Sequence, residues 1–166
     1  MNIRDILAAQ MALSGAKPLA AAPGHTSMEQ LTNRMTQEAV ISGSQTVEIN
    51  HFLGAIIGHP SGPTRFHLAE ALREEGLRET EVRERLGLKE YDHTVELSQG
   101  VNRSTEVEGI FMYARIFAKQ REDALCINDL LAAAVLKLTG THGVQAIDST
   151  GLARILARHI KATYYL

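Results

Sequence analysis

The sequence lacks the residues and patterns on which several classes of protein depend. Only one of its 166 residues is a cysteine, Cys126, so no disulfide can form within the chain and no site with several cysteine ligands exists. No apolar run approaches the roughly 20 residues that a membrane-spanning helix needs. The formal net charge is −2 and no dense block of lysine and arginine occurs. We therefore expect a cytoplasmic protein with no nucleic-acid partner and no membrane insertion.

Motifs for nucleotide, metal or covalent chemistry are also missing. The loop at 58–64 has glycines but no lysine, and its prolines remove amide donors, so it does not match the phosphate-binding pattern Gly-x-x-x-x-Gly-Lys-Ser/Thr. His51, His59 and His67 are eight residues apart, but the prolines between them place them on different elements. We expect no nucleotide, no metal, no cofactor and no catalytic residue, and we keep a small hydrolase only as a third alternative.

One apolar segment occurs twice in the chain. Residues 49–57 begin Ile-Asn-His-Phe-Leu, and residues 127–135 begin Ile-Asn-Asp-Leu-Leu, at an offset of 128 − 50 = 78. Each copy has an asparagine, Asn50 or Asn128, immediately before a strongly apolar stretch, which predicts a buried helix with asparagine at its cap. The chain is therefore interpreted as a duplicated unit.

Turn signals and helical spacing around each copy predict about four helices per unit. In the first unit, 27–88, the predicted helices cover residues 27–41, 50–57, 65–75 and 80–86. In the second unit, 98–160, they cover residues 99–120 and 127–138, a single turn, and residues 152–160. No stretch alternates between polar and apolar residues, so strands are not expected. The predicted fold class is all-α, with two pseudo-repeats packed on a shared core.

Helical spacing also predicts which side chains face that core. The predicted core positions of the long helices are Leu31, Met35, Ala39 and Val40 in the first unit and Val107, Ile110, Phe111, Ala114 and Phe117 in the second. Val82 and Leu86 are expected to point inward from the short helix at 80–86. The charged run from Arg73 to Arg85 carries opposite charges three to four residues apart and is interpreted as a solvated helical face.

The segments outside the repeats are expected to be peripheral. Residues 1–26 are predicted to form an arm with a short amphipathic helix followed by a linker rich in alanine, proline and glycine, and residues 161–166 form a tail. The arm is either loosely held or a docking peptide for a partner. The residues that would carry this docking are Ile3, Ile6, Leu7 and Met11.

The motifs of the first unit resemble a known module. The segment Val47-x-Ile49-Asn50-His51-Phe52-Leu53, followed by Ala69-x-Ala71-Leu72-x-x-x-Gly76-Leu77, resembles the double-repeat N-terminal domain of the Clp/Hsp100 chaperones, whose buried helix commonly begins Thr-Glu-His-Leu-Leu. The likeness covers about residues 27–160 and is stronger in the first unit. It implies a double Clp-N repeat that recognises protein.

The chain departs from that family at the positions of its ligand chemistry. Asn50 and Asn128 stand where the family has glutamates, which in some members help to bind phosphorylated arginine on substrates. Asparagine cannot pair with a guanidinium as an ion, so we do not expect phosphoarginine recognition. The second histidine of the motif is replaced by Asp129, and the AAA+ ATPase domains of the family are missing from this chain.

The sequence thus favours a non-enzymatic adaptor or accessory module that binds a partner through a groove between the half-repeats. The partner would be a Clp ATPase or peptidase component, or a substrate protein. The alternative is a docking subunit of a larger assembly such as a bacterial secretion apparatus. The predicted binding residues are Asn50, His51, Asn128, Asp129, Tyr91 and His93. Of these, His51 is interpreted as a packed histidine rather than a catalytic base.

Overall fold

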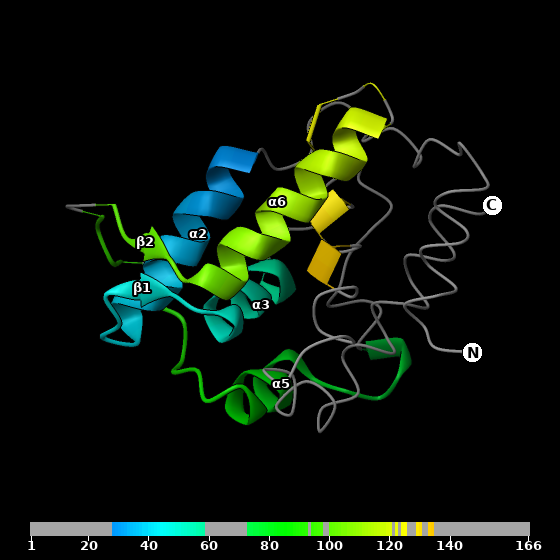
Figure 1. Cartoon of the computed structure of the whole chain (residues 1–166). Coiled ribbons are helices and arrows are strands. Elements are labelled where there is room, and N and C mark those ends of the chain that lie inside the picture. The colour runs from blue at the N-terminus through cyan, green and yellow to red at the C-terminus, as the bar shows by residue number, and fades with distance from the viewer. Residues whose placement is uncertain are drawn as a thin grey trace. The chain divides into compact units, whose positions relative to one another are not determined.

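The described part of the protein is mostly helical in a computed structural model (Figure 1). The structure describes residues 28–58, 73–92, 94–97, 100–120, 122, 124–125, 129–130 and 133–134. Its elements in chain order are α2 (Met28–Ile41), β1 (Thr46–Val47), α3 (Ile49–Ile57), α5 (Glu79–Arg85), β2 (Asn102–Arg103) and α6 (Thr105–Gln120). None of the described helices is both long enough and apolar enough to cross a membrane.

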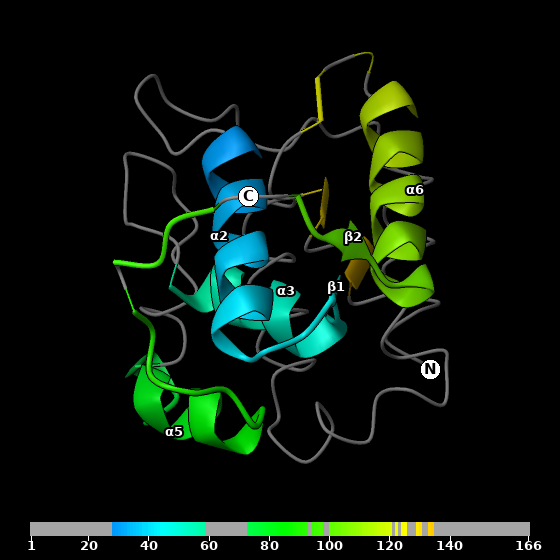
Figure 2. The ribbon, with the colours of Figure 1, turned by 90° about the vertical axis from the view of Figure 1, so that its left-hand side faces the viewer.

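The described residues belong to two compact units of the structure, whose bounds differ from those of the two predicted repeats. From here on, the first unit means the described residues up to Glu108, and the second unit begins at Gly109. Each unit is considered by itself. The first contains α2, α3, α5, both strands and the first turn of α6, and in Figures 1 and 2 its helix α5 lies below α2 and α3. The apolar side chains buried in this unit are Leu31, Met35, Ala39, Val47, Phe52, Leu53, Ala55, Ile56, Ile57, Val82, Leu86, Leu88 and Val107.

Helix α2 ends where the sequence predicts. Gly43 adopts a φ of +72°, a left-handed conformation that glycine tolerates because it has no Cβ. Its N–H donates to the Val40 carbonyl at 3.0 Å, and the N–H of Ser44 donates to the Ala39 carbonyl at 2.9 Å, which is the Schellman pattern. Gly87, with a φ of +70°, ends α5 in the same way. Val40, predicted to face the core, is 40% exposed, because it lies at the edge of the buried stripe of α2.

Helix α3 is buried from His51 to Ile57, as the repeated motif predicts. The prediction that Asn50 caps this helix is wrong, because α3 begins at Ile49 with Glu48 at the N-cap. The Glu48 N–H donates to Nδ1 of His51 at 2.9 Å, so the side chain of the third helical residue reaches back to the cap. Asn50 instead donates from Nδ2 to the carbonyl of Leu86, at 3.4 Å, and so links α3 to the end of α5.

Two short strands form a parallel pair that the sequence does not predict. Thr46 pairs with Asn102 and Val47 with Arg103, and Figures 1 and 2 show β1 and β2 side by side. Strands of two residues are too short to show an alternating pattern. The pairing also accounts for the later start of α6, which begins at Thr105 and not at 99: the residue before it, Ser104, donates its N–H to the Val47 carbonyl.

The interpretation of residues 73–85 as a solvated face is wrong at one position. Arg83 is only 6% exposed, so it is buried together with Val82 and Leu86. The burial of Val82 and Leu86 is predicted, and that of Arg83 is not. The sequence pattern misses this because the partner of Arg83 comes from α2, 45 residues earlier in the chain.

The second unit contains α6 from Gly109 onward, and its predicted core positions Ile110, Phe111, Ala114 and Phe117 are buried. Residues 129–130 and 133–134 are helical, and Leu130, Ala133 and Ala134 among them are buried. The remaining predicted elements, namely the arm helix, most of the helix at 65–75 and the helix at 152–160, lie outside the described residues.

Candidate functional site

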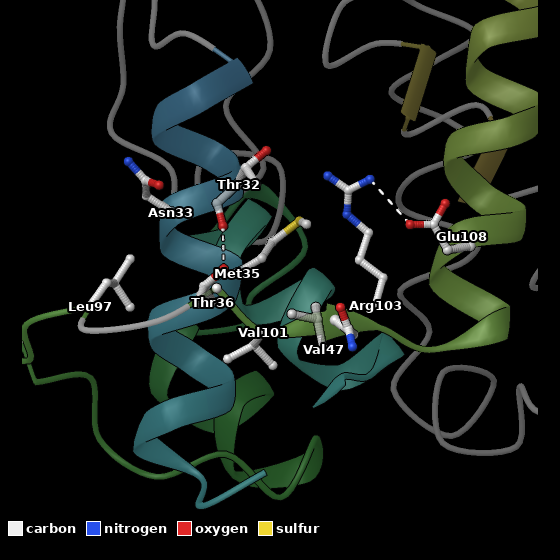
Figure 3. Close-up of a pocket in the computed structure, with 11 residues that line it drawn as sticks. Thr32, Asn33, Met35, Thr36, Val47, Leu97, Val101, Arg103 and Glu108 are labelled. Atoms are coloured by element: carbon white, nitrogen blue, oxygen red, sulfur yellow. Dashed lines mark hydrogen bonds and ion pairs between the residues drawn. The ribbon is translucent and has the colours of Figure 1, made fainter. Parts of the chain in front are cut away.

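An open cleft of about 500 Å³ lies in the first unit, between α2 and the segment that leads into β2 (Figure 3). Thr32, Asn33, Met35 and Thr36 line it from α2, and Val47 lines it from β1. The rest of the described lining comes from the extended segment and from the start of α6: Leu97, Gly100, Val101, Asn102, Arg103 and Glu108.

The cleft takes its shape from the β pair. Because Asn102 and Arg103 pair with β1, the chain from Gly100 to Arg103 is held extended along one wall. Figure 3 shows Arg103 reaching toward Glu108, and the two side chains form an ion pair of 3.4 Å. The Arg103 side chain is 21% exposed and that of Glu108 is 52% exposed, so solvent screens this pair.

The α2 wall offers hydrogen-bond acceptors. The hydroxyl of Thr36 donates to the Thr32 carbonyl at 3.1 Å, and the hydroxyl of Thr32 donates to the Met28 carbonyl at 2.8 Å. Each hydroxyl proton is thus used within the helix, while each oxygen keeps lone pairs. The described lining contains no histidine and no cysteine. The cleft can therefore hold a ligand by shape, apolar contact and hydrogen bonds, with the Arg103–Glu108 pair as the charged part of its lining.

A buried ion pair joins α2 to α5 elsewhere in the first unit. Nη1 of Arg83 donates to Oε1 of Glu38 at 2.6 Å, and its Nη2 donates to Oε2 at 3.0 Å. The same Nη2 also donates to the carbonyl of Lys89 at 2.5 Å. The side chains are 8% and 1% exposed, so this bidentate pair is sequestered from water.

The ring of Tyr91 lies near two guanidinium groups, that of Arg83 in this pair and that of Arg34. The guanidinium of Arg34 lies 3.7 Å from the ring centroid, and that of Arg83 lies 6.0 Å from it. The phenol donates a short hydrogen bond to Oε1 of Gln37. Burial raises the pKa of the Tyr91 phenol, against the opposing effect of the Arg34 charge. The phenol is therefore a hydrogen-bond donor at neutral pH.

His51 is a packed, hydrogen-bonded residue of α3, as the sequence indicates. It is 3% exposed, and burial lowers the pKa of its imidazole, while Glu38 and Glu48 act in the opposite direction. Because Nδ1 accepts the N–H of Glu48, the ring is neutral and carries its proton on Nε2.

Of the six residues predicted to bind a partner, the four that the structure describes do not line the cleft. Asn50 and His51 lie in the first turn of α3, Tyr91 stacks on Arg34, and none of the three is among the described residues that line the cleft. Asp129 is fully buried in the second unit. The others, Asn128 and His93 with the docking residues Ile3, Ile6, Leu7 and Met11, lie outside the described residues, and the binding role of the whole set stays a prediction.

Sequence reasoning missed both the cleft and the Glu38–Arg83 pair. One signal for the pair was present: Glu38 lies three residues after Met35 and seven after Leu31, on the apolar face of α2. A carboxylate on such a face requires a partner. No comparable signal marks the cleft, because its walls depend on a β pairing between distant segments.

The described part of the chain holds no group of three or more histidine, cysteine, aspartate or glutamate side chains placed to bind a metal ion. No protein-family model matches the chain, and no curated protein matches its sequence. The resemblance to the Clp N-terminal domain therefore rests on the sequence motifs alone.

Proposed function

We propose that the chain is a non-enzymatic protein-binding module that holds a segment of a partner polypeptide in the cleft between α2 and β2. The observation that carries this proposal is the cleft itself, which is open, lined by extended main chain from Gly100 to Arg103 and faced by the Thr32 and Thr36 oxygens. Extended peptides bind to such surfaces through main-chain hydrogen bonds, and small apolar side chains beside the groove add contact area.

A duplicated, Clp N-domain-like architecture is the scaffold that we propose for this module. Two features of the helices support it. The buried positions of α2 recur in α6 at an offset of 79, which relates Leu31 to Ile110, Met35 to Ala114 and Ala39 to Ala118. The offset of the α3 motif is 128 − 50 = 78, so the second connector between the paired helices would be one residue shorter.

The partner that we favour is a component of a Clp-type chaperone–protease or one of its substrate proteins. A recognition module whose 166 residues carry no nucleotide-binding motif suits an adaptor that tethers such partners. The alternative is a subunit of a secretion apparatus that docks through the arm at residues 1–26, as its amphipathic spacing indicates.

The test is affinity capture with a matched pair of charge substitutions. Leu97 lines the cleft and is 36% exposed, whereas Val40 is 40% exposed and is not among the described lining residues. Leu97→Glu places a charge in the cleft, so capture of Clp ATPase or peptidase subunits, or of a Clp substrate, should fall about tenfold, which corresponds to ~1.4 kcal/mol. Val40→Glu should leave capture unchanged.

Two results would separate the proposals. Equal capture by both variants would show that the cleft is not the binding surface. Deletion of residues 1–24 should leave capture intact. If the deletion abolishes it, and secretion components are the proteins lost, the docking-arm alternative is correct.

A further inference from the structure

Arg34 is a cation that stacks on an aromatic ring and has no anionic partner among the described residues. It is half-buried on α2, and its guanidinium lies over the Tyr91 ring at 3.7 Å. Its Nε is shielded from water and makes no hydrogen bond. None of the ion pairs among the described residues involves Arg34: they join Arg83 to Glu38, Arg78 to Glu81 and Arg103 to Glu108.

The neighbours of Arg34 place a second positive charge near it and leave it without the Glu38 carboxylate as a partner. The Glu38 carboxylate, which could have paired with it, is occupied on both oxygens by Arg83. The Arg83 guanidinium also approaches the same ring, so two cations share Tyr91 in a partly desolvated region. A charge that is withdrawn from water is normally paired or hydrogen-bonded, and stacking on a tyrosine offsets only part of that loss.

The packing around Arg34 accommodates its guanidinium. A Cβ on Gly58 would overlap Nη2 of Arg34, so the absence of a side chain at Gly58 leaves room for the guanidinium. The Tyr91 ring and Gly58 therefore pack against a guanidinium whose N–H groups form a planar fork. Such a fork matches the two oxygens of a carboxylate or phosphate.

We propose that Arg34, packed against Tyr91 and Gly58, is a binding site for one oxyanion group, either a carboxylate or a phosphate. This inference goes beyond the proposed function, because the site is separate from the cleft. Arg34 follows Thr32 by two residues, which places it roughly 200° around α2 from that lining residue. The site also belongs to the first unit alone, since Tyr113 occupies the corresponding position of α6 at the offset of 79.

The test uses the full chain labelled with ¹⁵N and follows the Hε–Nε signal of Arg34, assigned by its loss in Arg34→Lys. Sodium acetate and sodium phosphate are the probes, and sodium chloride at matched ionic strength is the control. We expect a saturable shift with a midpoint at roughly millimolar concentration, the affinity that suits one charged group acting on a small ion. Saturation by acetate identifies a carboxylate site, and saturation by phosphate alone identifies a phosphate site.

For the variants, the midpoint is measured from the chemical shift of the Gly58 backbone amide, because every variant contains this residue. Arg34→Lys keeps the charge but loses the fork, so the midpoint should rise at least about tenfold. Arg78→Lys, a control at a side chain that is 83% exposed and lies outside the site, should leave the midpoint unchanged. Shifts that follow chloride as closely as the other salts, or an unchanged midpoint in Arg34→Lys, would overturn the proposal. Neither result bears on capture through the cleft.

Discussion

Removal of one partner from the Glu38–Arg83 pair should destabilise the protein far more than removal of both. In Arg83→Met the Glu38 carboxylate would remain at 0% exposure without its bidentate donor, and the carbonyl of Lys89 would lose its donor as well. In Glu38→Leu the guanidinium would be left at 6% exposure, with an Nε that already has no partner. Each single variant therefore leaves a buried charge unpaired.

The magnitude follows from the geometry of the pair. The two hydrogen bonds of 2.6 and 3.0 Å place the centres of charge roughly 4 Å apart, and at an effective dielectric constant of about 20 their attraction is ~4 kcal/mol. Loss of one partner from such a buried pair costs about 3–5 kcal/mol. With a urea dependence of about 1–3 kcal/mol per molar, the unfolding midpoint should fall by at least roughly 1 M.

The double variant Glu38→Leu/Arg83→Met should recover most of this loss, because an apolar pair of similar volume has no charge to desolvate. Urea unfolding of the four proteins, followed by circular dichroism, gives the coupling free energy directly.

Two outcomes would refute this reasoning. If the losses of the two single variants simply add in the double variant, the side chains do not interact as a pair. If Arg83→Met costs less than about 1 kcal/mol, the pair is solvated as a surface ion pair is.

Two further predictions concern pH and the backbone. Because burial lowers the pKa of His51 below its ordinary 6.5, the unfolded chain binds the proton more readily, so the stabilising contribution of the neutral ring is full above pH 6.5 and is lost as the pH falls through the folded pKa. The free energy of unfolding should thus fall between about pH 7.5 and pH 5 by more in the wild type than in His51→Gln, and equal slopes would contradict the assignment. Gly43→Ala should cost about 1–2 kcal/mol in urea unfolding, because its φ of +72° strains any L side chain although no atom lies within 4 Å. Gly100→Ala, at an equally open position without a left-handed φ, should leave the free energy of unfolding unchanged. Equal losses of this free energy in both variants would rule out strain as the cause.

Local signals predicted part of the fold well. The stops after α2 and α5 follow from Gly43 and Gly87, because glycine adopts a positive φ without a steric penalty. The apolar run after Asn50 predicted a buried helix, but its cap was misplaced. The sequence offers an asparagine that favours the cap, while the structure uses Glu48 with the His51 ring, a pairing that depends on side-chain geometry.

The candidate sites were harder to predict, because each depends on residues that are distant in the chain. Tyr91 was singled out as a partner-binding residue, a role that stays a prediction, and the sequence contains no signal for its contact with Arg34, which lies far from it in the chain. Asn50, which was singled out at the start of α3, donates a hydrogen bond to the Leu86 carbonyl. Only the packing of α5 against α3 brings this carbonyl near.

The sequence by itself determined the helical content, the ends of two helices and most of the buried positions, because helix propensity, capping and amphipathic spacing act over a few residues. The tertiary structure alone decided where charge is buried and where the surface opens. Arg83 became a core residue because α2 brings Glu38 to it, and the cleft exists because β1 pairs with β2. Both depend on contacts between segments that are distant in the chain. The spacing of Glu38 on the apolar face of α2 indicates a buried carboxylate, but no local pattern identifies its partner or the β pair.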